Sequence, residues 1–255
     1  MDDRRAGERN RLMVHPAAAR VVLGQLQRAD STSDITRVVM TDPALVAAVM
    51  RAANSAHLGY SRRIASLRQA SVMLGGSLVG SLAASRVADL VFDPDAPDYP
   101  EWLWLHSLAM GCACSVLARH TGDSVDEAFT VGILHDVGWL LAASTGISMA
   151  PNDVDHAVAG ADLLARWNLP DRVVSAVRND HTRASALNAP LDRLVVASHG
   201  IVAAMGVPSP ERSLSPGEAL RLVNLSHVRQ SLLADQIDSE LTSLTSELTA
   251  TPETR

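Results

Sequence analysis

The stretch Thr130-Val-Gly-Ile-Leu-His-Asp-Val-Gly138 is the most informative part of this chain, because it sets His135 and Asp136 side by side within an apolar run. The run is typical of a buried helix. A buried carboxylate costs on the order of several kcal/mol unless it is paired or bound to a metal. Neighbouring side chains on a helix diverge by about 100°, so two cations could share Asp136 while His135 holds one of them. The stretch therefore predicts a metal site inside a helical core.

Further imidazoles and carboxylates lie on the neighbouring predicted helices, at His106, His156, Asp180, His181 and His199. These are the ligand types that borderline and hard divalent cations prefer. One such histidine is more often a core or capping residue, and His181 at a helix C-terminus could simply favour the helix dipole. Their joint occurrence on successive helices favours a shared site. We predict a metal centre made of all seven residues, with Asp136 catalytic if the site is active. We assign packing or capping roles to the other histidines, His15, His57, His120 and His227.

Composition and residue spacing predict an all-α protein. Apolar residues make up 47% of the chain and aromatic residues only 3%, so the core must be built from Ala, Leu, Val and Ile, which suits closely packed helices. No convincing alternation with period two indicates a strand. Helices are expected at 16–28, 35–40, 44–57, 67–75, 77–91, 101–120, 124–144, 153–167, 170–180, 190–205, 216–223 and 226–247.

Prolines at positions 94, 97 and 100 mark the boundary between two predicted helical lobes. We expect a disordered N-terminus at 1–13, an N-terminal lobe at 14–92, a second lobe at 101–207 and a helical extension at 208–255. The extension carries an amphipathic stripe of Leu225, Val228, Leu232, Ile237, Leu241 and Leu244. Such a stripe more often packs within its own chain than it dimerises.

The charge and cysteine content exclude several classes of protein. A formal net charge of −6 argues against a nucleic-acid surface, which needs a basic stripe. Arg62, Arg63 and Arg68 form a small basic group, for which a solvated surface is favoured over a phosphate or acidic-partner contact. Cys112 and Cys114 are two apart on a predicted helix, so they face different ways and are expected to be buried and reduced. The absence of a long apolar run or a signal-like start predicts a cytoplasmic protein without a membrane partner.

Several motifs in order resemble known families. Thr130–Gly138 resembles the GLLHDIG signature of the HD phosphohydrolase superfamily. The first lobe resembles the HDOD domain in four segments, Met40-Thr-Asp-Pro-Ala-Leu45, Ala52-Ala-Asn-Ser-Ala56, Ile64-Ala-Ser-Leu67 and Gln69-Ala-Ser-Val-Met-Leu-Gly75. Downstream of His156 and Gly160, Asp162-Leu-Leu-Ala-Arg-Trp-Asn-Leu-Pro170 is similar to a later HDOD motif. The resemblance covers about residues 14–207.

This resemblance implies a helical domain of bacterial signalling with an HD-like core in the second lobe. HDOD relatives regulate through protein contacts, and they have usually lost parts of the HD site. By the resemblance, His106 matches the first HD histidine, His135 and Asp136 the defining pair, and His156 the histidine before the glycine. The chain thus keeps more of the site than an HDOD protein is expected to keep.

Other positions depart from the HD pattern. Asp180-His181 stands where metal-dependent HD relatives often carry His-His, and His199 stands in place of the final aspartate. Trp139 replaces the lysine of cyclic-dinucleotide phosphodiesterases, and no GYP motif follows His181. Neutral imidazole does not offset two divalent charges as a carboxylate does, so one cation (iron, manganese or zinc) or none is easier than two.

Two functions stay open from the sequence. The first is a regulatory signalling domain that acts through a protein partner or a nucleotide or cyclic-dinucleotide ligand. The second is a metal-dependent phosphohydrolase that acts on a nucleotide or cyclic dinucleotide. Direct binding to DNA is disfavoured by the charge. We favour regulation and predict weak or absent hydrolase activity, because the lysine suited to stabilising phosphate is missing.

Overall fold

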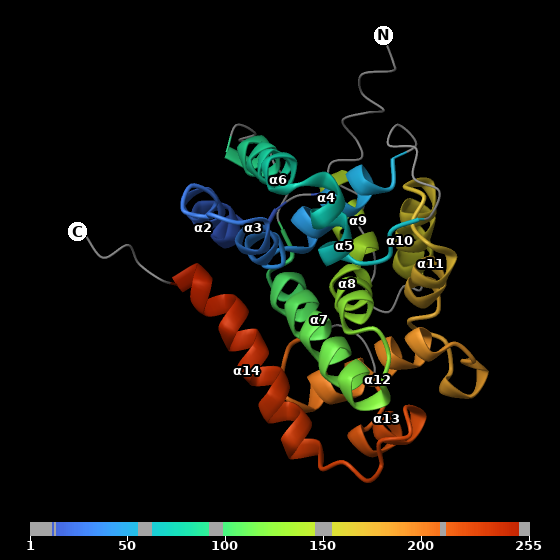
Figure 1. The fold of residues 1–255 in the computed structure, drawn as a ribbon. Coiled ribbons are helices and arrows are strands. Elements are labelled where there is room, and N and C mark those ends of the chain that lie inside the picture. Colours follow the sequence, from blue (N-terminus) through green and yellow to red (C-terminus); the bar gives the residue numbers. More distant parts are fainter. Residues whose placement is uncertain are drawn as a thin grey trace.

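The computed structural model describes residues 12, 14–55, 63–91, 99–145, 155–209 and 213–249, and it contains no strand among them (Figure 1). The first group of helices is α2 (Pro16–Leu26), α3 (Thr32–Val39), α4 (Pro43–Ala53), α5 (Leu67–Leu74) and α6 (Gly76–Val91). The second group is α7 (Glu101–Thr121), α8 (Val125–Leu134), α9 (Val137–Thr145), α10 (Asp155–Arg166), α11 (Asp171–Arg178), the short 3₁₀ helix η2 (Ala184–Ala186), α12 (Pro190–Ala204) and α13 (Pro216–Leu222), followed by α14 (Gln230–Thr249). The predicted all-α class is confirmed.

Local capping explains where the early helices begin. Ser31 and Asp34 form a capping box, so α3 begins earlier than the predicted residue 35. Asp42 accepts hydrogen bonds from backbone N–H groups in the first turn of α4, and Pro43 occupies the first position of that helix. Ser66 caps α5 by accepting a hydrogen bond from the Gln69 N–H, so α5 begins at the predicted residue 67.

The single helix predicted at 124–144 is wrong, because the chain breaks between α8 and α9. α8 ends at Leu134, His135 and Asp136 form a turn, and α9 begins at Val137. The His135 Nδ1–H donates to the Gly132 carbonyl at 2.6 Å. The histidine ring therefore takes up a carbonyl that a continued helix would use for a backbone bond. The break in the helix falls at the two residues that matter most for the site.

The two groups of helices pack mainly among themselves but share one continuous buried core, which confirms a two-lobed helical bundle. Two of the hydrogen bonds that join the lobes are wholly or partly buried. The Leu67 N–H donates to Thr130 Oγ1 at 2.9 Å, and Trp104 Nε1–H donates to the Thr41 carbonyl at 2.9 Å. Asn54 also fixes the return of the chain after α4, since its side chain exchanges hydrogen bonds with the backbone of Ile64.

α14 lies along α7 and also contacts α2, so the extension packs on its own chain (Figure 1). The buried residues of α14 include Leu233, Ile237 and Leu244, whereas Leu232 is exposed. The predicted stripe therefore needs Leu233 in place of Leu232. Of the predicted disordered segment 1–13, only Leu12 lies within the described residues, and it is buried. Most of the boundary at 93–100 lies outside them.

The segment Val125–Thr145 is long and apolar enough to cross a membrane by length and composition, but most of it is buried in the protein core. The α5–α6 pair satisfies the same test only if its two helices, bent by 111°, are counted together. Both features are typical of core helices in a folded domain.

Candidate metal centre

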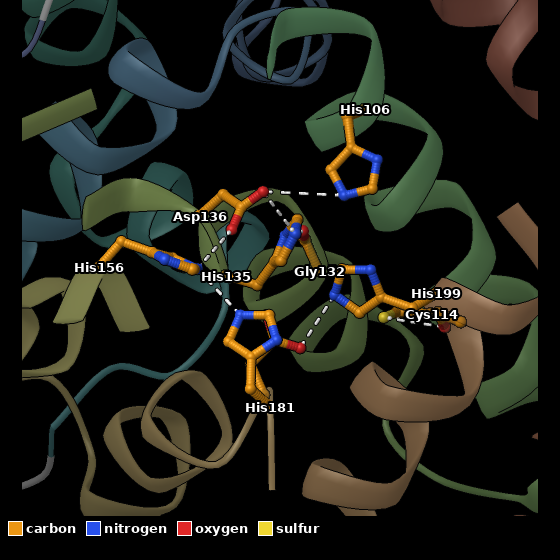
Figure 2. Close-up of polar contacts among 10 residues, drawn as sticks. His106, Cys114, Gly132, His135, Asp136, His156, His181 and His199 are labelled. Atoms are coloured by element: carbon orange, nitrogen blue, oxygen red, sulfur yellow. Dashed lines mark hydrogen bonds and ion pairs between the residues drawn. The ribbon is translucent and has the colours of Figure 1, made fainter. Parts of the chain in front are cut away.

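The seven residues predicted to bind metal converge on one buried region between the helices of the second lobe (Figure 2). α7 supplies one histidine and α12 another. The α8–α9 turn supplies the adjacent pair, the first turn of α10 supplies one histidine, and the turn after α11 supplies the other pair. We call this set the His/Asp cluster, and its members are His106, His135, Asp136, His156, Asp180, His181 and His199.

Asp136 lies between three imidazoles (Figure 2). Its Oδ2 is 3.0 Å from His135 Nε2 and 3.7 Å from His106 Nε2. Its Oδ1 is 3.6 Å from His156 Nε2. The two oxygens of one carboxylate thus face different histidines, which is the arrangement the sequence suggested for an aspartate shared between two cations.

Asp180 organises the other half of the cluster. Its Oδ1 is 2.9 Å from His199 Nε2, and its Oδ2 is 3.6 Å from His181 Nε2. His181 Nε2 in turn lies 2.9 Å from His156 Nε2, so the two halves are continuous. By the resemblance, His199 stands where HD proteins carry their final aspartate. Here the imidazole instead contacts the carboxylate of Asp180, in the turn after α11.

Close helix packing places His156 beside Asp136. A Cβ added at Gly138 would lie 1.9 Å from the His156 carbonyl oxygen, and one at Gly160 would lie 3.0 Å from the Gly138 nitrogen. Only glycine permits this approach of α9 and α10. The missing side chain at Gly160 leaves no open space beside the imidazole, because α9 fills it.

A polar network that the sequence analysis missed holds the turn carrying Asp180. Asn179 Nδ2–H donates to Asp192 Oδ2 at 2.7 Å and to Ser175 Oγ at 3.1 Å. Asp192 is buried in the first turn of α12, the helix that carries His199. The only sequence signal was an acidic residue beside an apolar helix, which is also common at exposed helix starts. The network fixes the turn against α12.

Burial sets the electrostatics of the cluster. Burial and the neighbouring His135 lower the pKa of His106 to about 3, so this imidazole is neutral. Burial alone would also lower the pKa of His135, but the adjacent Asp136 carboxylate outweighs it and raises that pKa to about 9. Burial opposes the charge on Asp180, yet the histidines around it, His199 first, hold its pKa well below the usual range.

Several buried polar atoms of the cluster have no hydrogen-bond partner among the described residues. They include both ring nitrogens of His106, Nε2 of His135 and Oδ2 of Asp180. Such atoms cost free energy unless something satisfies them. Two groups of three residues each bring one possible ligand atom per residue to within 4.8 Å of one another. The first group is His106, His135 and His199, and the second is His135, Asp136 and Asp180. Because the Gly132 carbonyl fixes the His135 Nδ1–H, its Nε2 is left to act as a ligand. The residues present therefore fit a divalent cation.

Aromatic side chains, rather than cations, line one side of the cluster. Trp139 stacks on His156 with ring centroids 4.9 Å apart, and Trp102 meets Trp139 edge-on at 5.8 Å. Arg178, close to Asp180 in sequence, pairs instead with Asp162 at 2.6 Å. Trp139 is thus a packed indole beside the cluster.

The described residues that were assigned to other roles make contacts with residues outside the His/Asp cluster or are exposed. His15 stacks on Trp104 at 4.7 Å, His120 bonds to Gln236 at 3.0 Å, His227 is exposed, and His57 lies outside the described residues. Cys112 and Cys114 are free and buried, as predicted, with Cys114 Sγ 3.2 Å from Ser198 Oγ. Of the basic group, Arg63 pairs with Asp171 and Arg68 with Asp126, while Arg62 lies outside the described residues.

Similarity to known proteins agrees with this architecture. The HDOD domain family matches residues 13–150, and the HD domain family matches residues 103–222. An uncharacterised protein of Treponema pallidum (strain Nichols) is 29% identical over 175 residues, which cover 58% of this chain and 33% of the relative. Ribonuclease Y of Pelobacter propionicus is 27% identical over 135 residues, which cover 52% of this chain and 24% of that protein. The chain thus spans a third or less of the length of these curated relatives.

Among solved structures, the MmoQ response regulator of Methylococcus capsulatus strain Bath superposes with a TM-score of 0.71 at 22% identity, covering 88% of this chain and 97% of that one. At this identity the likeness shows a common fold. The HDOD match, in contrast, extends over more than half of the chain and includes both the first lobe and the adjacent His135–Asp136 pair. The chain therefore belongs to the HDOD domain family.

Proposed function

We propose that this protein is a cytoplasmic signalling domain of the HDOD type that binds a divalent cation in the His/Asp cluster and regulates a protein partner. The observation that carries the metal is that both ring nitrogens of His106, Nε2 of His135 and Oδ2 of Asp180 are buried and have no hydrogen-bond partner among the described residues. A protein tolerates desolvated polar atoms of this kind where a ligand satisfies them.

The types of ligand atom in the cluster limit which divalent cation would bind. Five imidazoles and two carboxylates suit Fe²⁺, Mn²⁺ or Zn²⁺ better than Ca²⁺ or Mg²⁺, which prefer oxygen ligands alone. His106, His135 and Asp136 would hold the cation. His156 faces the other oxygen of Asp136, and His181 contacts the same ring nitrogen, Nε2, of His156.

Regulation is supported over catalysis by the surroundings of the cluster. Trp139 packs where a cation would face a phosphate, and the chain contains no lysine. Of the seven cluster residues, His181 is the most exposed, with 21% of its side chain accessible. The other six cluster residues are buried, so a large substrate could approach the cluster only from the side of His181.

A second candidate is a metal-dependent phosphohydrolase acting on a nucleotide or cyclic dinucleotide. The position of Asp136 between three imidazoles favours it, since one carboxylate can then bridge two cations. A bound divalent cation supplies a water of lowered pKa as nucleophile. Asp136 would orient that centre, and His181 at its accessible side would exchange protons with the reacting groups.

Two measurements test these proposals. Metal analysis of protein purified without chelator should find near-stoichiometric iron, manganese or zinc, which is lost in His135→Ala and kept in His120→Ala. A metal-free wild-type protein that also fails to take up Zn²⁺ or Mn²⁺ would refute the metal centre. Turnover of cyclic dinucleotides and of bis-p-nitrophenyl phosphate with added Mn²⁺ should be absent. Clear turnover that Asp136→Asn abolishes would instead establish the phosphohydrolase.

A further inference from the structure

A cavity of about 250 Å³ lies apart from the His/Asp cluster, where α3, α5, α7, α8 and α14 meet. An apolar cavity of ~150 Å³ is enough to bind benzene, so this one has room for a larger small molecule. It is bounded by helices of both lobes and by the C-terminal extension.

Most of the cavity wall is apolar. The apolar lining residues are Met40, Leu67, Val125, Phe129 and Leu244. Phe129 lies close against α7 because position 111 is glycine, where an added Cβ would be 3.0 Å from its ring. The Leu67 N–H is fixed to Thr130 Oγ1 at 2.9 Å, which ties the α5 wall to α8. The apolar surface is therefore held open by packed helices, as in preformed ligand sites.

One polar group on the wall is unused. Ser115, on α7, lines the cavity and is only 4% exposed, and its hydroxyl makes no hydrogen bond to any described residue. The hydroxyl lies on the cavity wall, where a polar group of a ligand could form a hydrogen bond with it. Ser115 therefore marks the place where the polar end of a ligand would lie.

The rim of the cavity is charge-balanced. Arg68 pairs with Asp126 at 3.1 Å, and Arg119 pairs with Glu240. These two arginines and two carboxylates leave the rim without net charge, so it offers no net attraction to an ion. A charged ligand would also lose hydration on entering the apolar cavity, so the site favours an uncharged ligand over an anion or a cation.

We infer that this cavity is a binding site for a neutral small molecule with an apolar body of roughly 6–10 non-hydrogen atoms and one group that hydrogen-bonds Ser115. A ligand there touches α7 and α8, the helices that carry His106 and lead to His135. It also touches α14, so its occupancy would strengthen the attachment of the extension to the body of the protein. This inference does not depend on metal in the His/Asp cluster.

The test uses the full chain and 1-octanol as the probe, with binding followed by NMR chemical-shift titration. Ser243 lines the mouth of the cavity from the exposed side of α14, so Ser243→Trp should block the site and abolish saturable shifts. Ser239→Trp is the matched control, because Ser239 is exposed on the same helix and is not part of the lining. Ser115→Ala should weaken 1-octanol about 3- to 10-fold, the worth of one hydrogen bond.

Sodium octanoate and octylammonium test the charge argument, and each should bind at least tenfold more weakly than 1-octanol. Tighter binding of either ion would overturn the neutral class of ligand. Absence of saturable 1-octanol shifts in the wild type, or shifts that persist in Ser243→Trp, would overturn the site itself. Full affinity in Ser115→Ala would contradict the assigned role of the hydroxyl.

Discussion

The Nε2 atoms of His156 and His181 lie 2.9 Å apart, although the residues come from opposite ends of the α10–α11 pair. Two imidazole nitrogens meet at this distance when one donates a proton to the other or when both face one cation. The contact also joins the Asp136 half of the cluster to the Asp180 half.

Replacing His181 by alanine should weaken cation binding while keeping the fold. His181 is the most accessible cluster member, with 21% of its side chain exposed, so its loss leaves little cavity. The apparent affinity for Mn²⁺ or Zn²⁺ should fall on the order of tenfold or more, as measured by competition with a metallochromic indicator. His227→Ala is the control, because His227 is exposed outside the cluster. Equal affinities in the two variants would remove His181 from the centre.

Replacing His106 by leucine should stabilise the metal-free protein. Both ring nitrogens of His106 are buried and have no hydrogen-bond partner in the described part of the chain, whereas a leucine of similar size buries no polar atom. In the presence of chelator, the free energy of unfolding in urea should rise by roughly 1–2 kcal/mol. Addition of Zn²⁺ should stabilise the wild type more than the variant, since stabilisation by a ligand follows its affinity for the folded state. A destabilised variant in chelator would indicate that His106 is satisfied without metal.

Replacing Gly138 by alanine should damage both the fold and the centre. The new Cβ would lie 1.9 Å from the His156 carbonyl oxygen, so α9 and α10 must separate. We expect a loss of roughly 3 kcal/mol in unfolding free energy, together with reduced metal content. Gly24→Ala is the matched control within a helix, since its nearest neighbour would be 3.9 Å away. It should gain about 0.5–1 kcal/mol. Wild-type stability in Gly138→Ala would contradict the close approach.

The stability of the first lobe should depend on pH through Asp42. This carboxylate is fully buried, and burial raises its pKa from 3.8 to about 7 despite three backbone N–H donors, from His15, Ala44 and Leu45. Between pH 4 and pH 7 the folded chain holds a proton that the unfolded chain has lost. The contribution of Asp42 is therefore greatest at low pH and falls as pH rises to about 7, by up to about 4 kcal/mol.

Asp42→Asn should remove this slope and still cap α4, because asparagine is an equally good cap. Urea unfolding at pH 5 and pH 8 measures the difference. Asp162→Asn is the control, since that carboxylate is exposed and pairs with Arg178 on the surface. A pH dependence unchanged in Asp42→Asn would show that Asp42 is ionised in the folded chain throughout this range.

The helical class, most helix starts and the membership of the cluster were predictable from the sequence. Caps such as Asp42 before Pro43 act within one turn, so the local sequence is sufficient to find them. The seven cluster residues could be named because buried imidazoles and carboxylates are rare in an apolar context. The break after Leu134 was not predictable, because the apolar pattern continues through it and the His135–Gly132 bond depends on the orientation of one ring.

Only the tertiary structure decided which imidazole meets which carboxylate. Asp136 faces His106, His135 and His156, while Asp180 faces His199 and His181. These pairings depend on the separation and rotation of packed helices, which the Gly138–Gly160 approach sets for α9 and α10. The sequence specifies such contacts only through the whole core. The type and spacing of residues in a sequence can therefore identify candidate metal ligands. The distances of a few ångström between those ligand atoms are set by how the helices pack.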